Sequence, residues 1–327
     1  MSDLALDPHE TPCAGDTPEG PVFDALPGRE VALGPHTVVR RLLPHRTRRM
    51  VGAWCFADHF GPDDVFGGPG MQVPPHPHTG LQTATWLLDG EVRHADSLGT
   101  VQPIRPGQLN LMTAGRGISH AEVSPDGTAP VLHGLQLWIA LPAQEAHGPP
   151  RFEHHAALPA LSAAGWRATV AVGELMGARS PAGTHTPIVG AEVAVGGPGV
   201  LELRPEWEHA LLLIDGSAAV EGRTLVRGSL AYLGAERREV RLSSEVGARL
   251  FLLGGEPFHD ELVMWWNFVG RSHAEIAEAR ADWMAGVADP DPGGRFGVVA
   301  AYDGPPLPAP ALPGVRLKAR TRRGEQA

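Results

Sequence analysis

A short motif that occurs twice constrains the fold of this chain more than any other feature. The sequence WLLDG occupies positions 86–90, and the similar LLIDG occupies 212–216, an offset of about 126 residues. Each is followed by a glycine, Gly107 or Gly228, that opens a strand-like run. An internal repeat of this length indicates two domains of similar architecture, and 327 residues are enough to bury a core in each.

Short apolar runs separated by turn residues point to strands. In 131–141 the side chains alternate between two faces, which predicts a long strand with both faces partly buried. Similar strand predictions cover 38–43, 81–88 and 108–112. The chain also contains 41 glycines and 32 prolines, which suits a protein with many turns better than a helical bundle. We therefore predict an all-β fold with a few short helices.

Changes in composition set the expected domain bounds. Residues 1–25 are rich in Asp, Glu, Pro and Gly and lack periodicity, so we expect a flexible leader there. The first domain is expected to span 26–145 and the second 188–310, joined by a linker at 146–187 that includes two adjacent prolines. Residues 311–327 are expected to form a solvated tail.

One helix is predicted after the repeat of the second domain. Ser272 and Glu275 have the spacing of a capping box, and Gly286 is a suitable end. Its apolar side chains are spaced by three to four residues, so we expect the helix to pack against a sheet. Trp265 and Trp266, which precede it, are expected to be core or inter-domain packing residues.

Charge and composition exclude several classes of partner. The net charge is −10, with 37 acidic and 27 basic residues, and this balance gives no basic surface for direct contact with nucleic acid. The sequence has no run of eighteen apolar residues and no secretory signal, so neither a membrane span nor export is expected. Cys13 and Cys55 lie in unlike surroundings, and we expect no disulfide between them. These features favour a cytoplasmic protein.

Two histidines stand one residue apart in the segment PPHPHTGLQTATWLLDG at 74–90. In extended backbone, alternate side chains point to the same side, so His76 and His78 can reach one ion together. Pro77 between them stiffens the segment. Histidines in a proline-rich loop are ordinarily surface residues, so this pair alone is weak evidence for a metal site.

A second pair, His120 and Glu122, has the same spacing and follows a turn at 115–117. The two pairs together supply three imidazoles and one carboxylate. This set suits a borderline divalent metal, Fe(II), Mn, Co, Ni, Cu or Zn, and leaves one or two coordination positions open. The alternative is two unrelated surface pairs, and the strand-rich context favours the metal site over it.

The motifs of the chain resemble those of one family, the pirins, a bicupin branch of the cupin superfamily. The resemblance runs through FADHFGP (56–62), PHPHTGLQTATWLLDG (75–90), RHADSLG (93–99), MTAGRGISHAE (112–122), HGLQLW (133–138) and MWWNFVGRS (264–272). It implies two cupin β-sandwich domains with an iron site in the first. The ligands implied by the matching positions are His76, His78, His120 and Glu122.

The resemblance and the repeat refine this ligand set. The general cupin pattern has a glutamate four residues after the second histidine, where this chain has Gln82. The carboxylate is therefore expected from Glu122, and Gln82 is expected to be a bystander in the pocket wall. Carried forward along the repeat, the four ligand positions fall on Glu202, Arg204, Arg241 and Ser243. Because these residues form no metal ligand set, we expect the second domain to be a packing partner or a degenerate cavity.

Other polar residues of the shared motifs have two alternative roles each. His94, His133 and Gln136 are either donors that orient the ligand imidazoles or polar groups with a purely structural role. His59 and Arg116 are expected at a turn or at the rim of the site.

The resemblance implies two functions that need the same four residues. In the first, the protein is a quercetin 2,3-dioxygenase that acts on flavonols with dioxygen, and Glu122 takes the proton of the 3-hydroxyl group. In the second, it is a non-enzymatic, redox-sensitive regulator that binds a metabolic enzyme or a transcription factor. A third alternative is a cupin that keeps the shape without the metal. The sequence leaves all three open.

Overall fold

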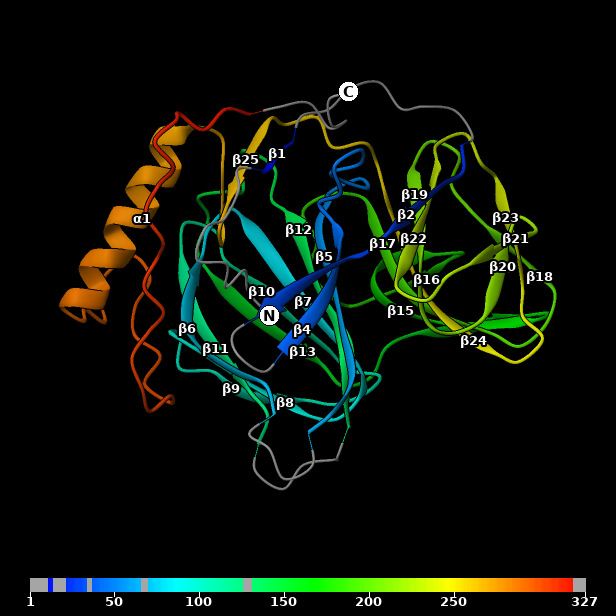
Figure 1. The fold of residues 1–327 in the computed structure, drawn as a ribbon, viewed down its shortest axis with the longest axis horizontal. Coiled ribbons are helices and arrows are strands. Elements are labelled where there is room, and N and C mark those ends of the chain that lie inside the picture. The colour runs from blue at the N-terminus through cyan, green and yellow to red at the C-terminus, as the bar shows by residue number, and fades with distance from the viewer. Residues whose placement is uncertain (1–10, 14–21, 34–36, 66–69, 126–130, 320–327) are drawn as a thin grey trace.

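The computed structural model describes residues 11–13, 22–33, 37–65, 70–125 and 131–319. These residues form two β-sandwich domains and one helix, α1 (His273–Ala288), which lies at the opposite end of the molecule from the second domain (Figure 1). The prediction of an all-β fold with two similar domains is confirmed. Most of the predicted leader and half of the predicted tail lie outside the described residues. The described parts correct these two predictions, because residues 11–13 and 24–25 of the leader belong to paired strands and Leu317 of the tail is buried.

The first domain packs a seven-stranded sheet against a four-stranded sheet. The larger sheet has the order β13 (Arg151–His155), β10 (Leu109–Thr113), β7 (Leu81–Asp89), β12 (Val131–Ala140), β5 (Trp54–Asp64), β4 (Thr37–Leu43), β3 (Arg29–Leu33). The smaller sheet has the order β6 (Gln72–His78), β11 (Ile118–Val123), β8 (Val92–Asp96), β9 (Val101–Ile104). The four strands predicted from the sequence are β4, β7, β10 and β12.

The second domain has the same two-sheet plan. Its larger sheet has the order β14 (Ala160–Ala163), β15 (Trp166–Leu175), β17 (Ile188–Val195), β24 (Ala248–Gly255), β19 (Glu208–Gly216), β22 (Ser229–Gly234), β2 (Asp24–Pro27), with β16 (Ala178–Arg179) paired to β15. Its smaller sheet has the order β18 (Gly199–Glu202), β23 (Glu239–Ser243), β20 (Ala218–Val220), β21 (Arg223–Leu225).

The repeat in the sequence corresponds to a repeat in the topology. β7 ends within WLLDG and lies between β10 and β12, whereas β19 ends with LLIDG and lies between β22 and β24. Gly107 and Gly228 have φ angles of 79° and 70° in the turns that lead into β10 and β22, and glycine adopts such angles without strain. The repeat therefore marks equivalent strands of two domains.

The two large sheets share one hydrophobic core. Trp86 of β7 and Phe251 of β24 lie with ring centroids 6.1 Å apart across the seam. The indole of Trp54 donates to the backbone oxygens of Val189 and Gly254, both in the second domain, at 3.1 and 3.2 Å. The second domain therefore packs against the outer face of this sheet.

Both ends of the chain cross between the domains. β2 pairs with β22 of the second domain, although it precedes the first domain in the sequence. After β24 the chain returns to the first domain through the hairpin of β25 (Leu262–Trp265) and β26 (Phe268–Gly270), and β25 also pairs with β1 (Thr11–Cys13). Helix α1 follows the hairpin on this side of the molecule (Figure 1). β24 is thus the last strand that the chain adds to the two sheets of the second domain.

The expected linker at 146–187 is folded, which corrects the prediction. β13 extends the large sheet of the first domain, while β14, β15 and β16 belong to the second. The adjacent prolines, Pro149 and Pro150, stand directly before β13 at the end of a turn. The strands β13 and β14 are short and only partly buried, so they lack the clear alternation that identifies strands in a sequence.

Helix α1 begins where it was predicted. The Ser272 hydroxyl accepts a hydrogen bond from the Glu275 N–H at 3.2 Å, and the Glu275 carboxylate accepts from the N–H of Arg271. The helix and the hairpin share a hydrophobic cluster that includes Trp265, Trp266, Phe268, Ile276, Ala279 and Trp283, so both tryptophans pack as expected. The helix extends two residues beyond Gly286. No helix among the described residues combines the length and the apolar character needed to span a membrane.

Candidate metal centre

Three adjacent strands of the small sheet in the first domain each carry two polar side chains spaced by two residues. β6 carries His76 and His78, β11 carries His120 and Glu122, and β8 carries His94 and Asp96. In the strand register, His120 lies opposite His76 on one side and opposite Asp96 on the other. Because paired residues of neighbouring strands share a face, the six side chains project into the interior of the same sandwich.

The three histidines of the two predicted pairs come together. Their ring centroids are 4.3 Å apart for His76 and His120, 5.0 Å for His78 and His120, and 5.1 Å for His76 and His78. One ring nitrogen of each lies within 4.8 Å of those of the other two, a spacing that could hold a metal ion. All three are at most 1% exposed. The two pairs are therefore parts of one buried cluster and not separate surface features.

Hydrogen bonds fix which ring nitrogen of each histidine faces the cluster. The Nδ1–H of His76 donates to the backbone oxygen of Pro74 at 2.8 Å, and that of His78 donates to the backbone oxygen of Asn267 at 3.2 Å. The Nε2 atoms of His76, His78 and His120 are buried and have no hydrogen-bond partner. A buried nitrogen lone pair without a donor is costly unless an ion binds it, so these atoms fit a metal.

The protonation state of the cluster also suits metal binding. Burial lowers the pKa of His76 to about 4, and burial together with the neighbouring imidazoles lowers the pKa of His78 and of His120 well below the usual value. All three imidazoles are therefore neutral at neutral pH, and a metal need not displace a proton from them.

Glu122 lies on the same face of β11 as His120 but is not part of the group of nitrogens within 4.8 Å. Its Oε1 lies 3.4 Å from the hydroxyl of Thr85, and that hydroxyl is 2.9 Å from Oε1 of Gln136. The Thr85 hydroxyl thus lies between the Glu122 carboxylate and the side chain of Gln136, which is a candidate for an orienting role. All three side chains are buried.

Gln82 does not line the site, contrary to expectation. It lies on β7 three residues from Thr85, and an odd spacing along a strand places side chains on opposite faces. Its amide donates instead to the Thr113 hydroxyl at 2.9 Å and to the backbone oxygen of Gly183 at 3.0 Å. The prediction that Gln82 is a bystander agrees with these contacts, whereas its placement in the pocket wall was wrong.

Three other residues of the motifs lie apart from the triad. His59 is buried in the middle of β5, so its expected position at a turn or rim was wrong. Its Nε2 lies 2.8 Å from Nε2 of His133, which gives His133 a partner other than the triad. Arg116 is exposed in a turn, as expected.

A buried histidine in the second domain should make the stability of the protein depend on pH. Burial lowers the pKa of His209 to about 4. Between pH 6.5 and 4, the unfolded chain therefore binds a proton that the folded chain does not, and the free energy of unfolding falls as the pH falls. We expect His209→Gln to reduce this slope by up to about 1.4 kcal/mol per pH unit in urea denaturation of the metal-free protein. An unchanged slope would show that folding does not lower the pKa of His209.

The second domain offers an internal comparison. Glu202, Arg204 and Arg241, three of the four positions reached along the repeat, are exposed. The inward positions of the equivalent strand β23 are Val240 and Leu242, which belong to the apolar core of that domain. The alignment on the glycines is thus one residue out of register on β23. In the part of the second domain that the structure describes, no group of metal-ligating side chains replaces the triad.

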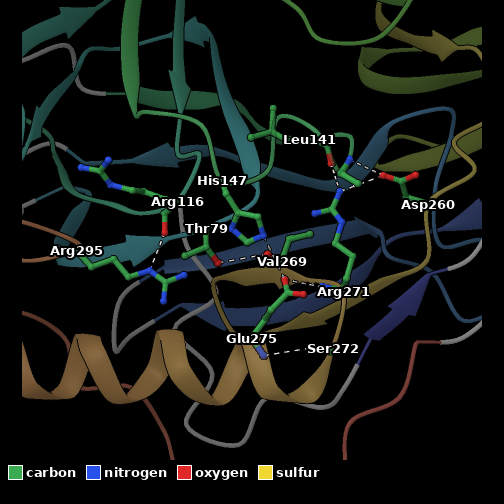
Figure 2. Close-up of polar contacts among 11 residues, drawn as sticks. Thr79, Arg116, Leu141, His147, Asp260, Val269, Arg271, Ser272, Glu275 and Arg295 are labelled. Atoms are coloured by element: carbon green, nitrogen blue, oxygen red, sulfur yellow. Dashed lines mark hydrogen bonds and ion pairs between the residues drawn. The ribbon is translucent and has the colours of Figure 1, made fainter.

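The hairpin of β25 and β26, which follows the second domain in the sequence, contacts the triad at His78. Its two-residue turn contains Asn267, the partner of His78, next to Trp266, which has a φ of 53°. Thr79 exchanges two hydrogen bonds with Val269, from the Val269 N–H at 3.1 Å and to the Val269 oxygen at 3.3 Å. The close-up in Figure 2 shows this contact between the hairpin and the strand end that carries His78.

Further polar contacts hold this segment in place (Figure 2). Arg271 donates to the backbone oxygen of Leu141 and lies 3.2 Å from the Asp260 carboxylate. Arg295 donates to the backbone oxygen of Arg116 at 2.8 Å. The chain that follows the second domain therefore positions a ligand candidate of the first.

Comparison with known proteins agrees with this architecture. The family model named Pirin matches residues 36–139, and the model of the pirin C-terminal cupin domain matches residues 191–289. A protein of Pseudomonas aeruginosa named "Putative quercetin 2,3-dioxygenase" is 46% identical over 295 residues, which cover 89% of this chain and 91% of that protein. A pirin-like protein of Caulobacter vibrioides is 38% identical over 276 residues, which cover 81% of this chain and 93% of that protein.

A solved structure extends the comparison to three dimensions. The crystal structure of quercetin 2,3-dioxygenase from Acinetobacter baumannii superposes with a TM-score of 0.85 and 42% sequence identity. The match covers 90% of this chain and 98% of that one. With both family models matched in order along the chain, this protein belongs to the pirin family and is a bicupin.

Proposed function

We propose that this protein is a mononuclear iron dioxygenase that cleaves flavonols, with quercetin as the model substrate. The ligands are His76, His78, His120 and Glu122. The observation that carries the proposal is the set of three buried imidazoles whose Nε2 atoms have no hydrogen-bond partner, with one ring nitrogen of each within 4.8 Å of those of the other two. The names of the similar proteins from Pseudomonas and Acinetobacter support the choice of reaction.

Three nitrogens and one carboxylate suit Fe(II), and they leave coordination positions for substrate and dioxygen. Bound iron would supply Lewis acidity toward the 3-hydroxyl and 4-carbonyl oxygens of the flavonol. In the overall reaction both oxygen atoms enter the product, and one carbon of the heterocycle leaves as carbon monoxide.

The protein side chains have separate tasks in this reaction. Glu122 accepts the proton of the 3-hydroxyl group, and its Oε1 lies 3.4 Å from the Thr85 hydroxyl. Trp138 contacts His78 edge to face at 5.1 Å and forms an apolar wall next to the triad. The triad and Glu122 are themselves buried and therefore shielded from bulk water.

The test is a turnover assay with the glutamate as its probe. The protein is loaded anaerobically with Fe(II), and quercetin and then oxygen are added while loss of quercetin and release of carbon monoxide are followed. We expect turnover by the wild type, and kcat lower by about 100- to 10,000-fold in Glu122→Gln with its iron retained. Glu202→Gln, an exposed carboxylate of the second domain, is the matched control and should leave kcat unchanged.

Iron-loaded wild type that leaves quercetin intact would contradict the proposal. The same outcome with Mn, Co, Ni, Cu and Zn would leave the redox-sensitive regulator as the function of the metal centre.

A further inference from the structure

The three histidines of the triad differ in what their second ring nitrogen contacts. His76 and His78 each donate to a backbone oxygen, whereas Nδ1 of His120 lies 3.2 Å from Nδ1 of His94. Nε2 of His94 in turn lies 3.0 Å from Oδ2 of Asp96. His120 is therefore the one member of the triad whose outer nitrogen leads through a second imidazole to a carboxylate.

The hydrogen bonds in this chain can run in only one direction if His120 binds a metal. A metal needs the lone pair of His120 Nε2, so the proton of that ring must be on Nδ1. His94 must then accept at Nδ1 and carry its own proton on Nε2, which donates to Asp96. The carboxylate at the end accepts and never donates, so it sets the tautomer of both imidazoles.

The two outer residues are held in place independently of His120. Oδ1 of Asp96 accepts from the backbone N–H groups of Leu98 and Thr100 at 2.9 and 3.0 Å, at the turn that follows β8. The ring of His94 stacks on Phe152 with centroids 4.4 Å apart and an interplanar angle of 22°. His94 and Asp96 are at most 4% exposed. Asp96 and His94 are thus held in a fixed arrangement in which His94 can accept a hydrogen bond from His120.

We propose that Asp96 and His94 are positioning residues that fix the tautomer and orientation of His120 as a metal ligand. This inference rests on the metal centre of the proposed function. It adds to that centre a hydrogen-bonded relay that runs from Asp96 through His94 to the ligand His120. Partners of this kind around metal-bound histidines are typically worth about 10- to 100-fold in metal affinity.

The environment of Asp96 makes one substitution unusually informative. In Asp96→Asn the amide oxygen must stay on the N–H groups of Leu98 and Thr100, because an amide nitrogen there would meet two donors. The amide nitrogen then faces His94 and donates to its Nε2. His94 must now carry its proton on Nδ1 and donate it to His120, which leaves the proton of His120 on Nε2, where the metal should bind.

The test is the affinity for Co(II), measured by competition with a chromophoric chelator and by the ligand-field spectrum of the bound ion. The variants are Asp96→Asn, His94→Phe, the two combined, and Ser97→Ala. Ser97 is the matched control because its hydroxyl accepts from the Ser119 N–H at 3.3 Å in the same turn without joining the relay. Near-ultraviolet circular dichroism of each metal-free variant confirms its folding.

We expect His94→Phe to weaken Co(II) binding by about 10- to 100-fold and Asp96→Asn to weaken it by at least as much. The double variant should bind like His94→Phe alone, because the amide introduced by Asp96→Asn then has no imidazole through which to act. Ser97→Ala should bind like the wild type. A purely structural role of Asp96 in its turn would instead make the losses of the two substitutions multiply.

Wild-type affinity in Asp96→Asn, or multiplied losses in the double variant, would overturn the inference. The assay uses neither flavonol nor oxygen, so it is independent of the proposed reaction. If the wild type binds Co(II) and the variants show these effects, but the iron-loaded wild type does not cleave quercetin, the relay is retained and the proposed dioxygenase function is refuted. A wild type that binds no Co(II) would refute the metal centre, and the relay with it.

Discussion

Replacing His120 by alanine is expected to remove most of the stabilisation of this protein by bound metal. A metal that binds only the folded chain at 100 times its Kd raises the free energy of unfolding by about 2.7 kcal/mol. The variant loses one of three imidazoles, and we expect its affinity to fall by more than about 100-fold, because removing a ligand costs more than removing the ligand's outer partner. At the same metal concentration the stabilisation would then be at most about 0.4 kcal/mol.

The measurement is the free energy of urea unfolding with and without Fe(II) under anaerobic conditions. His209→Ala is the matched control, because it also removes a buried histidine but lies in the second domain. The control should be less stable than the wild type yet gain the full increment from iron. An iron-dependent increment that survives in His120→Ala would contradict the assignment of the triad.

Asp58→Ala is expected to cause a large loss of stability. Asp58 accepts two hydrogen bonds from the guanidinium of Arg41, both at 2.9 Å, and the pair is almost fully buried. Removing one partner of a buried ion pair typically costs about 3–5 kcal/mol, because the other charge loses its compensation. Arg41 also lies over the ring of Phe56, 4.5 Å from its centroid, so it has little freedom to leave.

Urea denaturation measures this effect, and a surface ion pair provides its control. Arg179 contacts Glu174 at 2.7 Å, yet the arginine is 77% exposed. Arg179→Ala should leave the midpoint of unfolding unchanged, because solvent screens an exposed pair and replaces it readily. Equal losses in Asp58→Ala and Arg179→Ala would show that burial of the first pair is not what gives it its strength.

Much of the metal centre could be predicted from residue spacing, because a strand gives spacing a direct geometric meaning. Side chains two residues apart share a face of a strand, so the two side chains of each pair, at 76–78 and at 120–122, are expected to point to the same side. The same rule applied to His94 and Asp96 identifies the third pair. Gln82 shows the limit of counting along a family pattern, because the face of its strand and not its distance from the histidines decides its contacts.

The parts of the site that escaped prediction depend on long-range pairing. The partner of His78 is a backbone oxygen at Asn267, and a backbone oxygen has no signature in the sequence. The crossing of β2 to the second domain and of the hairpin to the first is likewise set by which sheet edges are free, and no local pattern of residues records this. The repeat predicted the equivalence of β7 and β19 because both strands keep the same motif at the same place.

One metal ion is expected to bind at the triad of the first domain. An anomalous difference map, recorded at the iron absorption edge from crystals of anaerobically iron-loaded protein, would locate this ion. We predict one strong peak per chain, about 2 Å from Nε2 of His76, His78 and His120, with the Glu122 carboxylate as the fourth protein ligand. A strongest peak in the second domain, or one that lacks contact with the three histidines, would contradict the account.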